Sequence, residues 1–252
     1  MRADAAAANT ASMQDPEPLY RDSWDNFWRD VATTTGEVFW DSDPTQAIER
    51  ELPLFQQELD ASLPLVDLGC GTGRQTRVLG EHFSRVLGLD VAEEAIVGAR
   101  QLHGGDHVDF RVFDVLDPAA ASRLHAEIGD ANVYVRAVLH QLRAAHRRPA
   151  VETLTTLLGA RGQAFVVELS PLAEALFASL GRELGGPPPK LARVFQHGIV
   201  PAALAAGEIP GLFAEFGFHV ALATRSSIVT TQPLPNGQMI EVPCDAWLFA
   251  RT

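Results

Sequence analysis

Closely spaced glycines follow a short apolar segment at residues 65–74, which read Leu-Val-Asp-Leu-Gly-Cys-Gly-Thr-Gly-Arg. Glycine lets the backbone turn tightly and lets a ligand approach without meeting a Cβ atom. A loop of this kind between a strand and a helix indicates a site for a nucleotide-like cofactor. Gly69, Gly71 and Gly73 are therefore candidate binding residues.

The spacing of these glycines argues against two common nucleotide sites. The NAD fingerprint has glycines at its first, third and sixth positions, whereas here Gly73 is fifth in the run and Arg74 is sixth. A phosphate-binding loop needs Lys followed by Ser or Thr, and this chain has Arg74-Gln75 instead. Both alternatives are disfavoured.

The segment Asp67-Leu68-Gly69-Cys70-Gly71-Thr72-Gly73 resembles the cofactor loop of class I S-adenosylmethionine-dependent methyltransferases of the small-molecule type. The resemblance covers residues 60–170 and includes Gly88-Leu89-Asp90 and Phe113-Asp114-Val115, each at the end of an expected strand. It implies S-adenosylmethionine as the cofactor and methyl transfer as the activity. Beyond residue 170 the likeness is in architecture alone.

This cofactor has no phosphate, so its site needs hydrogen-bond acceptors more than cations. The resemblance assigns Asp90 to the ribose hydroxyls, Asp114 to the adenine amine and Asp67 to the ammonium group. The alternatives are a helix N-cap for Asp90, a turn residue for Asp114 and a loop-stabilising role for Asp67. Cys70 is expected to pack in the loop rather than to react. The full implied cofactor set is Asp67, Gly69, Cys70, Gly71, Gly73, Asp90, Val91, Asp114, Val115 and Arg136.

His140 is the main candidate for a general base. The segment Ala137-Val138-Leu139-His140 follows the expected fourth strand and resembles small-molecule methyltransferases in which an apolar run ends in a Leu-His pair. A base contributes only if the acceptor holds a proton, and the alternative is a structural histidine. His197 is a weaker second candidate.

Two motifs that this sequence lacks limit the possible classes of methyl acceptor. The Asn/Asp-Pro-Pro-aromatic motif that accompanies methylation of nucleic acid bases and amides does not follow the fourth strand, so nucleic acid is disfavoured. Arg136 stands where catechol-type enzymes have a metal-binding Asp, so we expect no metal. The side chains left for an acceptor pocket are Trp24, Trp28, Trp40, Phe177 and Phe195.

The function that this sequence predicts is methyl transfer to an oxygen, nitrogen or carbon of a small, largely apolar metabolite. One alternative is an enzyme that acts on a protein or peptide. The other is a regulatory or scaffold protein that binds S-adenosylmethionine without turnover, because a binding loop says nothing about catalysis.

The elements that must position these residues alternate between strands and helices. Such alternation requires crossover connections and predicts a sheet covered on both faces, with ligands beyond the carboxyl ends of its strands. Pro235-Asn236-Gly237 predicts a final hairpin. We expect an α/β, doubly wound, mostly parallel Rossmann-like seven-stranded sheet that ends in this antiparallel hairpin. Expected strands cover residues 63–68, 85–89, 108–113, 132–135, 164–169, 219–231 and 239–251.

Three further regions surround or interrupt this pattern. Residues 1–19 lack periodicity and predict a flexible tail. Residues 20–58 predict an N-terminal helical cap, and residues 59–252 the methyltransferase domain. Within that domain, residues 171–199 predict a lid-like insertion with Gly and Pro breakers, and a helix is expected over 201–216.

The amino-acid composition limits the classes of protein to which this chain can belong. The 252 residues carry a net charge of −12, which does not suit binding to a phosphate backbone. The hydrophobic fraction of 46% allows a sizeable core, and the basic cluster at 143–148 is expected to be a solvated face. With two cysteines and no long apolar run, we expect a cytoplasmic protein without a membrane partner. The sequence does not indicate an oligomeric state.

Overall fold

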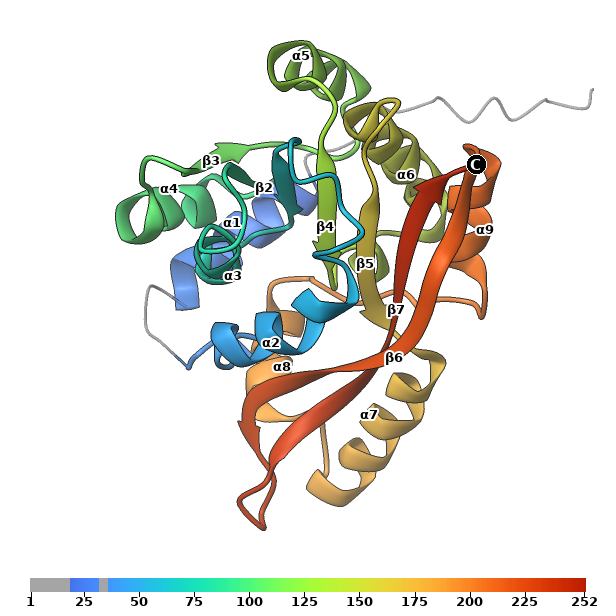
Figure 1. Ribbon diagram of the computed structural model, residues 1–252. Helices are drawn as coiled ribbons and strands as arrows, with labels where there is room; N and C mark the ends of the chain where they lie inside the picture. The colour runs from blue at the N-terminus through green and yellow to red at the C-terminus, as the bar shows by residue number, and fades with distance from the viewer. Residues whose placement is uncertain (1–18, 32–35) are drawn as a thin grey trace, which may run out of the picture.

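A computed structural model describes residues 19–31 and 36–252 (Figure 1). The tail predicted at residues 1–19 lies outside the described residues except for its last position. Within them, one sheet has the strand order β3-β2-β1-β4-β5-β7-β6. The strands are β1 Leu65–Leu68, β2 Val86–Asp90, β3 Val108–Val112, β4 Asn132–Arg136, β5 Ala164–Leu169, β6 Phe218–Pro233 and β7 Met239–Arg251.

The pairing confirms the predicted mostly parallel sheet with a terminal hairpin. Strands β1 to β5 are parallel to one another, while β7 is antiparallel to β5 and β6 is antiparallel to β7. The chain order reverses between β1 and β4, which pair in register from Leu65 with Asn132 to Leu68 with Val135. A crevice beyond the carboxyl ends of these strands is where open α/β sheets bind ligands.

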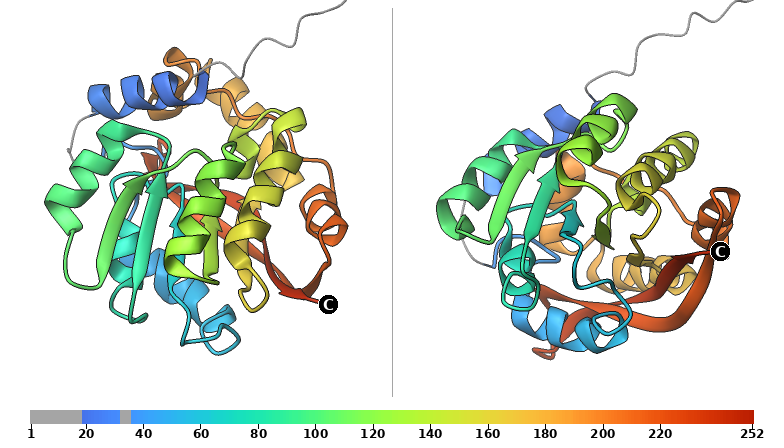
Figure 2. Two further views of the ribbon diagram at one scale, coloured as in Figure 1. Left: turned by 90° about the horizontal axis from the view of Figure 1, so that it is seen from above. Right: turned by 45° about the horizontal axis from the view of Figure 1, so that its top comes forward.

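Helices cover both faces of the sheet (Figure 2). Local sequence fixes several of their starts: Asp117 accepts the backbone N–H groups of Ala119 and Ala120, and Pro118 follows it at the first helical position. The helices are α1 Leu19–Val31, α2 Pro44–Glu51, η1 Leu52–Leu54, α3 Arg74–Leu79, α4 Glu93–His103, α5 Pro118–Ile128, η2 Leu139–Gln141, α6 Ala144–Leu158, α7 Pro171–Leu184, α8 Pro189–Gln196 and α9 Glu208–Glu215.

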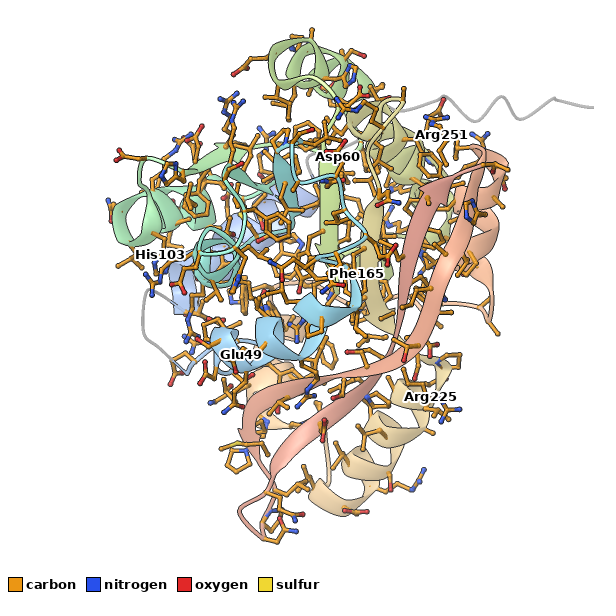
Figure 3. All side chains as sticks on the ribbon, viewed as in Figure 1. Glu49, Asp60, His103, Phe165, Arg225 and Arg251 are labelled. Carbon is orange, nitrogen blue, oxygen red and sulfur yellow. The ribbon has the colours of Figure 1, made fainter. Side chains whose placement is uncertain are left out.

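The two faces of the sheet bury separate apolar layers because side chains alternate along each strand. Val66 and Leu68 pack with α5, α6 and α9, whereas Leu65 packs with α2 and α3. Phe165 lies at the centre of the second layer and is fully buried, while Arg225 lies exposed on the outer strand (Figure 3). None of the described helices is long and apolar enough to cross a membrane.

The helix predicted over residues 201–216 is wrong in its first half, because α9 begins only at Glu208. The guanidinium of Arg147 donates to the carbonyl oxygens of Ala202 (2.6 Å) and Ala203 (3.0 Å), and the N–H of Ala202 donates to His140. These bonds hold residues 201–207 in an irregular path. Arg147 is 1% exposed, so this member of the predicted solvated cluster is instead a buried structural cation.

The β6–β7 hairpin extends well beyond β5, passes in front of α8 and runs beside α7 (Figure 1). Ile228 on β6 pairs directly with Val242 on β7, and both side chains are buried. Residues 171–199, the predicted insertion, form α7 and α8, which end and begin at the Gly-Pro breakers. The hairpin and this helix pair therefore enclose one end of the sheet together.

Asp67 is a buried carboxyl group on β1, and Thr76 Oγ1 donates to it at 2.6 Å. Burial raises its pKa to about 7, so between pH 4 and 7 the folded protein holds a proton that the unfolded chain has released. The contribution of Asp67 to stability therefore falls as the pH rises through this window. Asp67→Asn stays neutral, and its stability relative to the wild type should rise by roughly 2 to 3 kcal/mol between pH 5 and pH 8.

Urea unfolding of both proteins at each pH measures this difference. A difference that is constant across the window would show that Asp67 is already ionised in the folded state at pH 5.

Candidate functional site

A cavity of about 900 Å³ lies at the carboxyl ends of the central strands. Its lining includes Leu68, Asp90, Arg136 and Leu169, which end β1, β2, β4 and β5 respectively. Residues of α1, α7 and α8 line the opposite side. The cavity therefore lies where the strand order predicts a ligand site, and its size is in the range of small-molecule sites.

The glycine loop connects β1 to α3 with positive φ angles at Gly69 (+74°), Gly71 (+54°) and Gly73 (+78°). A Cβ atom at Gly69 would lie 2.3 Å from Val138, and one at Gly73 would lie 2.4 Å from Phe110. Both backbone conformation and space therefore require glycine. Gly69 and Gly71 line the cavity, whereas Gly73 lies outside its lining, at the start of α3.

Asp90 fixes the glycine loop from the end of β2. Its two carboxylate oxygens accept the backbone N–H groups of Gly71 and Ala92, each at 2.9 Å. A carboxylate can accept about four hydrogen bonds, so acceptor capacity remains for a ligand. The side chain is 9% exposed and lines the cavity, and burial raises its pKa.

The other predicted cofactor residues divide into two groups. Val91, Cys70, Asp114 and Val115 line the cavity, and Asp114 also accepts the N–H of Leu116 in a turn. Burial raises the pKa of the Cys70 thiol, which fits a packing role rather than a reactive one. Asp67 is absent from the cavity lining and contacts Thr76 beneath the loop, which fits the loop-stabilising alternative.

Arg136 brings a buried cation to the cavity from the end of β4. Its Nε lies 3.2 Å from Oε1 of Glu51 on α2, and Tyr134 donates to the other oxygen of this carboxylate at 2.5 Å. Glu51 is 1% exposed, and sequence reasoning missed it because nothing local marks it as buried. A guanidinium has five N–H groups, so Arg136 keeps donors for an anionic ligand group.

His140 lies on η2, lines the cavity and contacts Glu168, a fully buried residue of β5. Nδ1 of His140 is 2.7 Å from Oε2 of Glu168. Oε1 of the same carboxylate accepts the backbone N–H groups of Val138 (2.8 Å) and Leu139 (2.5 Å). Because a carboxylate only accepts, Nδ1 carries the proton and Nε2 is left as an acceptor. Nε2 lies 2.8 Å from the amide nitrogen of Gln141.

Glu168 is the second functional candidate that sequence reasoning missed. The available signal was a single charged residue within the apolar run Ala-Phe-Val-Val-Glu-Leu, near the carboxyl end of a parallel strand. A charge is rarely buried in such a strand unless it is paired. Ala137, which follows β4 three residues before His140, has φ of +60°, so the turn that carries His140 is itself strained.

The predicted aromatic side chains converge on the cavity. Trp24 and Trp28 on α1 pack around Trp40, with ring centroids 5.7 and 6.4 Å from it. Phe177 on α7 and Phe195 on α8 line the same space. These five residues come from three distant stretches of sequence.

His197 does not reach the cavity, so its predicted role as a second base is not supported by the geometry. Its Nε2 is 3.1 Å from Asp30 Oδ2, and its ring packs edge-on against Phe27. The imidazole is held at the outer side of α1, where it pairs with a carboxylate instead of facing a ligand.

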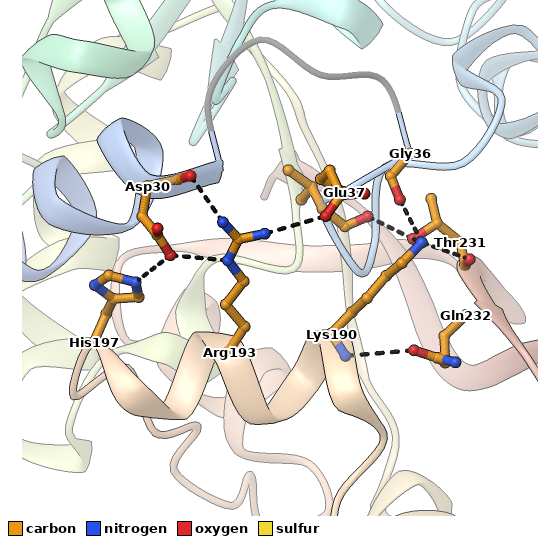
Figure 4. A network of polar contacts seen from close by, with 9 residues as sticks. Asp30, Gly36, Glu37, Lys190, Arg193, His197, Thr231 and Gln232 are labelled. Carbon is orange, nitrogen blue, oxygen red and sulfur yellow. Dashed lines mark hydrogen bonds and ion pairs between the residues drawn. The ribbon is translucent and has the colours of Figure 1, made fainter.

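A polar latch joins α8 to the end of α1 and to residues 36 and 37 (Figure 4). Arg193 contacts Asp30 Oδ2 through Nε (2.8 Å) and Glu37 Oε2 through Nη1 (3.1 Å). Lys190 donates to the carbonyl oxygen of Thr231 on β6 at 2.9 Å. Hydrogen bonds from Arg193 and His197 lower the pKa of Asp30 to about 2. We use the name latch for Asp30, Glu37, Lys190, Arg193 and His197.

The fold and the cavity together define an S-adenosylmethionine-dependent methyltransferase. The family model for a methyltransferase domain matches residues 66–164. A solved S-adenosylmethionine-dependent methyltransferase from Anabaena variabilis is 30% identical, with a TM-score of 0.88 over 92% of this chain and 95% of that chain. The chain belongs to this family, and S-adenosylmethionine is the family's cofactor, as the glycine loop predicted.

Two further relatives are more distant. Juvenile hormone acid O-methyltransferase of Bombyx mori is 29% identical over 109 residues, which cover 42% of this chain and 37% of that protein. The match thus spans little more than a third of this curated relative. Magnesium protoporphyrin IX methyltransferase from Synechocystis is 16% identical with a TM-score of 0.60 over 93% of this chain and 99% of that chain, a likeness of fold alone.

Arg193→Ala should loosen α1 and α8 because it removes two carboxylate contacts of the latch. We expect hydrogen exchange in α1 to accelerate about 3- to 10-fold while the sheet amides stay unchanged. Arg111→Ala is the matched control, since Arg111 also contacts two carboxylates, Asp109 and Glu127, and lies outside the cavity lining. If hydrogen exchange in α1 accelerates equally in both variants, the latch has no local role.

Proposed function

We propose that this methyltransferase methylates a small, largely apolar metabolite, and that the acceptor atom is a hydroxyl oxygen rather than a nitrogen or carbon. The observation that carries the proposal is the pair of His140 and Glu168 at the wall of an apolar cavity. A hydroxyl must lose its proton as it is methylated, and Nε2 of a neutral imidazole, which now accepts from the Gln141 amide, can accept that proton once the hydroxyl replaces the amide.

The residues at the carboxyl ends of the strands fit the cofactor. Asp90 would accept from the ribose hydroxyls and Asp114 from the adenine amine, while Arg136 would donate to the carboxylate of the amino-acid tail. Gly69 and Gly71 bring the backbone of the loop to the cavity wall, where it would border the ligand. When bound, the cofactor supplies a methyl group that its sulfonium has already activated for displacement.

The acceptor hydroxyl would take the position that the Gln141 amide now occupies beside His140. Among the residues that the structure describes, Oε1 of Gln141 and Oγ of Ser170 are buried without a hydrogen-bond partner, and both side chains belong to the cavity wall. The Oγ–H of Ser170 would donate to the oxygen of the acceptor hydroxyl while the hydroxyl proton passes to Nε2 of His140. Glu168 would then stabilise the resulting imidazolium through Nδ1.

The walls around this position favour a small apolar acceptor. Phe177, Leu191, Phe195, Ile228 and Val242 supply apolar surface from α7, α8 and the hairpin. A peptide acceptor would need an open groove, whereas here α1 and α8 meet across the latch. We therefore regard residues 171–199 as a lid and α1 as a cap over the acceptor.

The proposed function is tested by incubating the protein with methyl-labelled S-adenosylmethionine and a metabolite extract. We expect label in small, organic-extractable products. Label in proteins of a total lysate would favour the peptide alternative. Tight binding of S-adenosylhomocysteine without transfer to any fraction would favour a regulatory or scaffold protein.

The roles of His140 and Glu168 are tested by kinetics with an identified acceptor. His140→Ala should lower kcat by about 10² to 10⁴ with unchanged affinity for S-adenosylhomocysteine. Glu168→Gln presents an amide N–H to Nδ1, which favours the tautomer protonated at Nε2, so kcat should fall by at least about 10² while KM changes little. A loss below tenfold in both variants would indicate an acceptor that needs no base, such as a carboxylate.

A further inference from the structure

The indole edge of Trp28 lies against the glycine loop. A Cβ atom built on Gly71 would be 2.9 Å from Cζ2 of Trp28, 3.0 Å from Cη2 and 3.9 Å from Cε2. Nε1 is bonded to Cε2, so the only polar atom of this side chain lies on the edge that borders the loop. Trp28 therefore lines the part of the cavity next to the glycine loop, and not only the part proposed for the acceptor.

Nε1 of Trp28 is buried, and within the described ranges 19–31 and 36–252 it has no hydrogen-bond partner. The indole N–H can only donate, and an unsatisfied buried donor costs about 1 to 3 kcal/mol. The side chain is 8% exposed and belongs to the cavity lining, so a ligand in the cavity can supply the missing acceptor.

The ring is held in place before any ligand binds. Trp28 packs between Trp24, which is stacked on it, and Phe27, which meets it edge-on at 5.2 Å. The helix that carries it is tied to α4, because Arg29 contacts Glu94 at 2.8 Å and Asp25 accepts the N–H of Glu94. A donor fixed in this way loses little entropy when it binds.

Among the charged groups of the family's cofactor, the carboxylate of the amino-acid tail is the one that accepts hydrogen bonds, and a bond to a charged acceptor is stronger than one to a neutral adenine ring nitrogen. The ribose hydroxyls and the adenine amine need acceptors, and Asp90 and Asp114 are available for them. Arg136 is a donor for the tail on the sheet side, whereas α1 faces the loop from the other side.

We propose that Trp28 Nε1–H donates a hydrogen bond to the carboxylate of the cofactor's amino-acid tail. Trp28 then belongs to the cofactor site rather than to the acceptor pocket in which the sequence placed it. Cofactor binding and the docking of α1 are therefore linked, so each favours the other by the same free energy. This inference extends the proposed cofactor site, and its test measures binding without turnover.

The test is a thermodynamic cycle by calorimetry. Wild type and Trp28→Phe are titrated with S-adenosylhomocysteine and with its decarboxylated analogue, which keeps the nucleoside, sulfur and amine. Trp28→Phe should lower the affinity for S-adenosylhomocysteine by about 10- to 100-fold, because a hydrogen bond to a charged group is lost. It should change the affinity for the analogue by less than about twofold. Trp247→Phe, on β7 outside the cavity lining, is the matched control and should leave both affinities unchanged.

Equal losses for the two ligands, or no loss for S-adenosylhomocysteine, would overturn the assignment to the carboxylate. If Trp28→Phe does not fold, hydrogen exchange of the wild type decides the question. S-adenosylhomocysteine should then protect α1 more strongly than the decarboxylated analogue at equal saturation, and equal protection would also overturn the proposal. Because neither measurement needs an acceptor, failure of the proposed function leaves this test intact.

Discussion

The close approach of the glycine loop to three separate elements is the constraint on which the rest of this structure depends. Gly69 meets Val138 after β4, Gly71 meets Trp28 on α1, and Gly73 meets Phe110 on β3. None of these contacts leaves room for a Cβ atom, so the loop sets how near each element can come. The end of β2 is bound to the same loop through Asp90 and the N–H of Gly71.

Buried carboxylates collect around this loop and are each satisfied in a different way. Glu51 pairs with Arg136, Asp67 accepts from Thr76, and Asp90 and Glu168 accept backbone N–H groups. Burying a charge is costly unless it is paired or hydrogen-bonded, so these groups persist because their partners are fixed by the fold. Of these four groups only Asp90 lines the cavity, while Glu51, Asp67 and Glu168 fix the positions of Arg136, Thr76 and the turn that carries His140.

Sequence reasoning located the features that are encoded locally. The strand that runs into the glycine loop, the alternation of strands and helices, and the Asn236-Gly237 turn each depend on neighbouring residues. Glu51, Glu168 and Arg147 could not be assigned in this way because their burial depends on partners tens of residues away. The irregular path over 201–207 has the same origin, since Arg147 on α6 binds its carbonyl groups.

The hairpin that encloses one end of the cavity comes from a different part of the chain than the glycine loop at the other part of the lining. Ile228 and Val242 face each other across β6 and β7 and line the cavity from the C-terminal part of the chain, whereas the glycine loop, Asp90 and Asp114 belong to its first half. Because side chains alternate along a strand, a change at either position alters the shape of the cavity without moving the neighbours that face away from it. The shape of the cavity at this end therefore depends on one cross-strand pair that is distant in sequence from the glycine loop, so the two can be changed independently of each other.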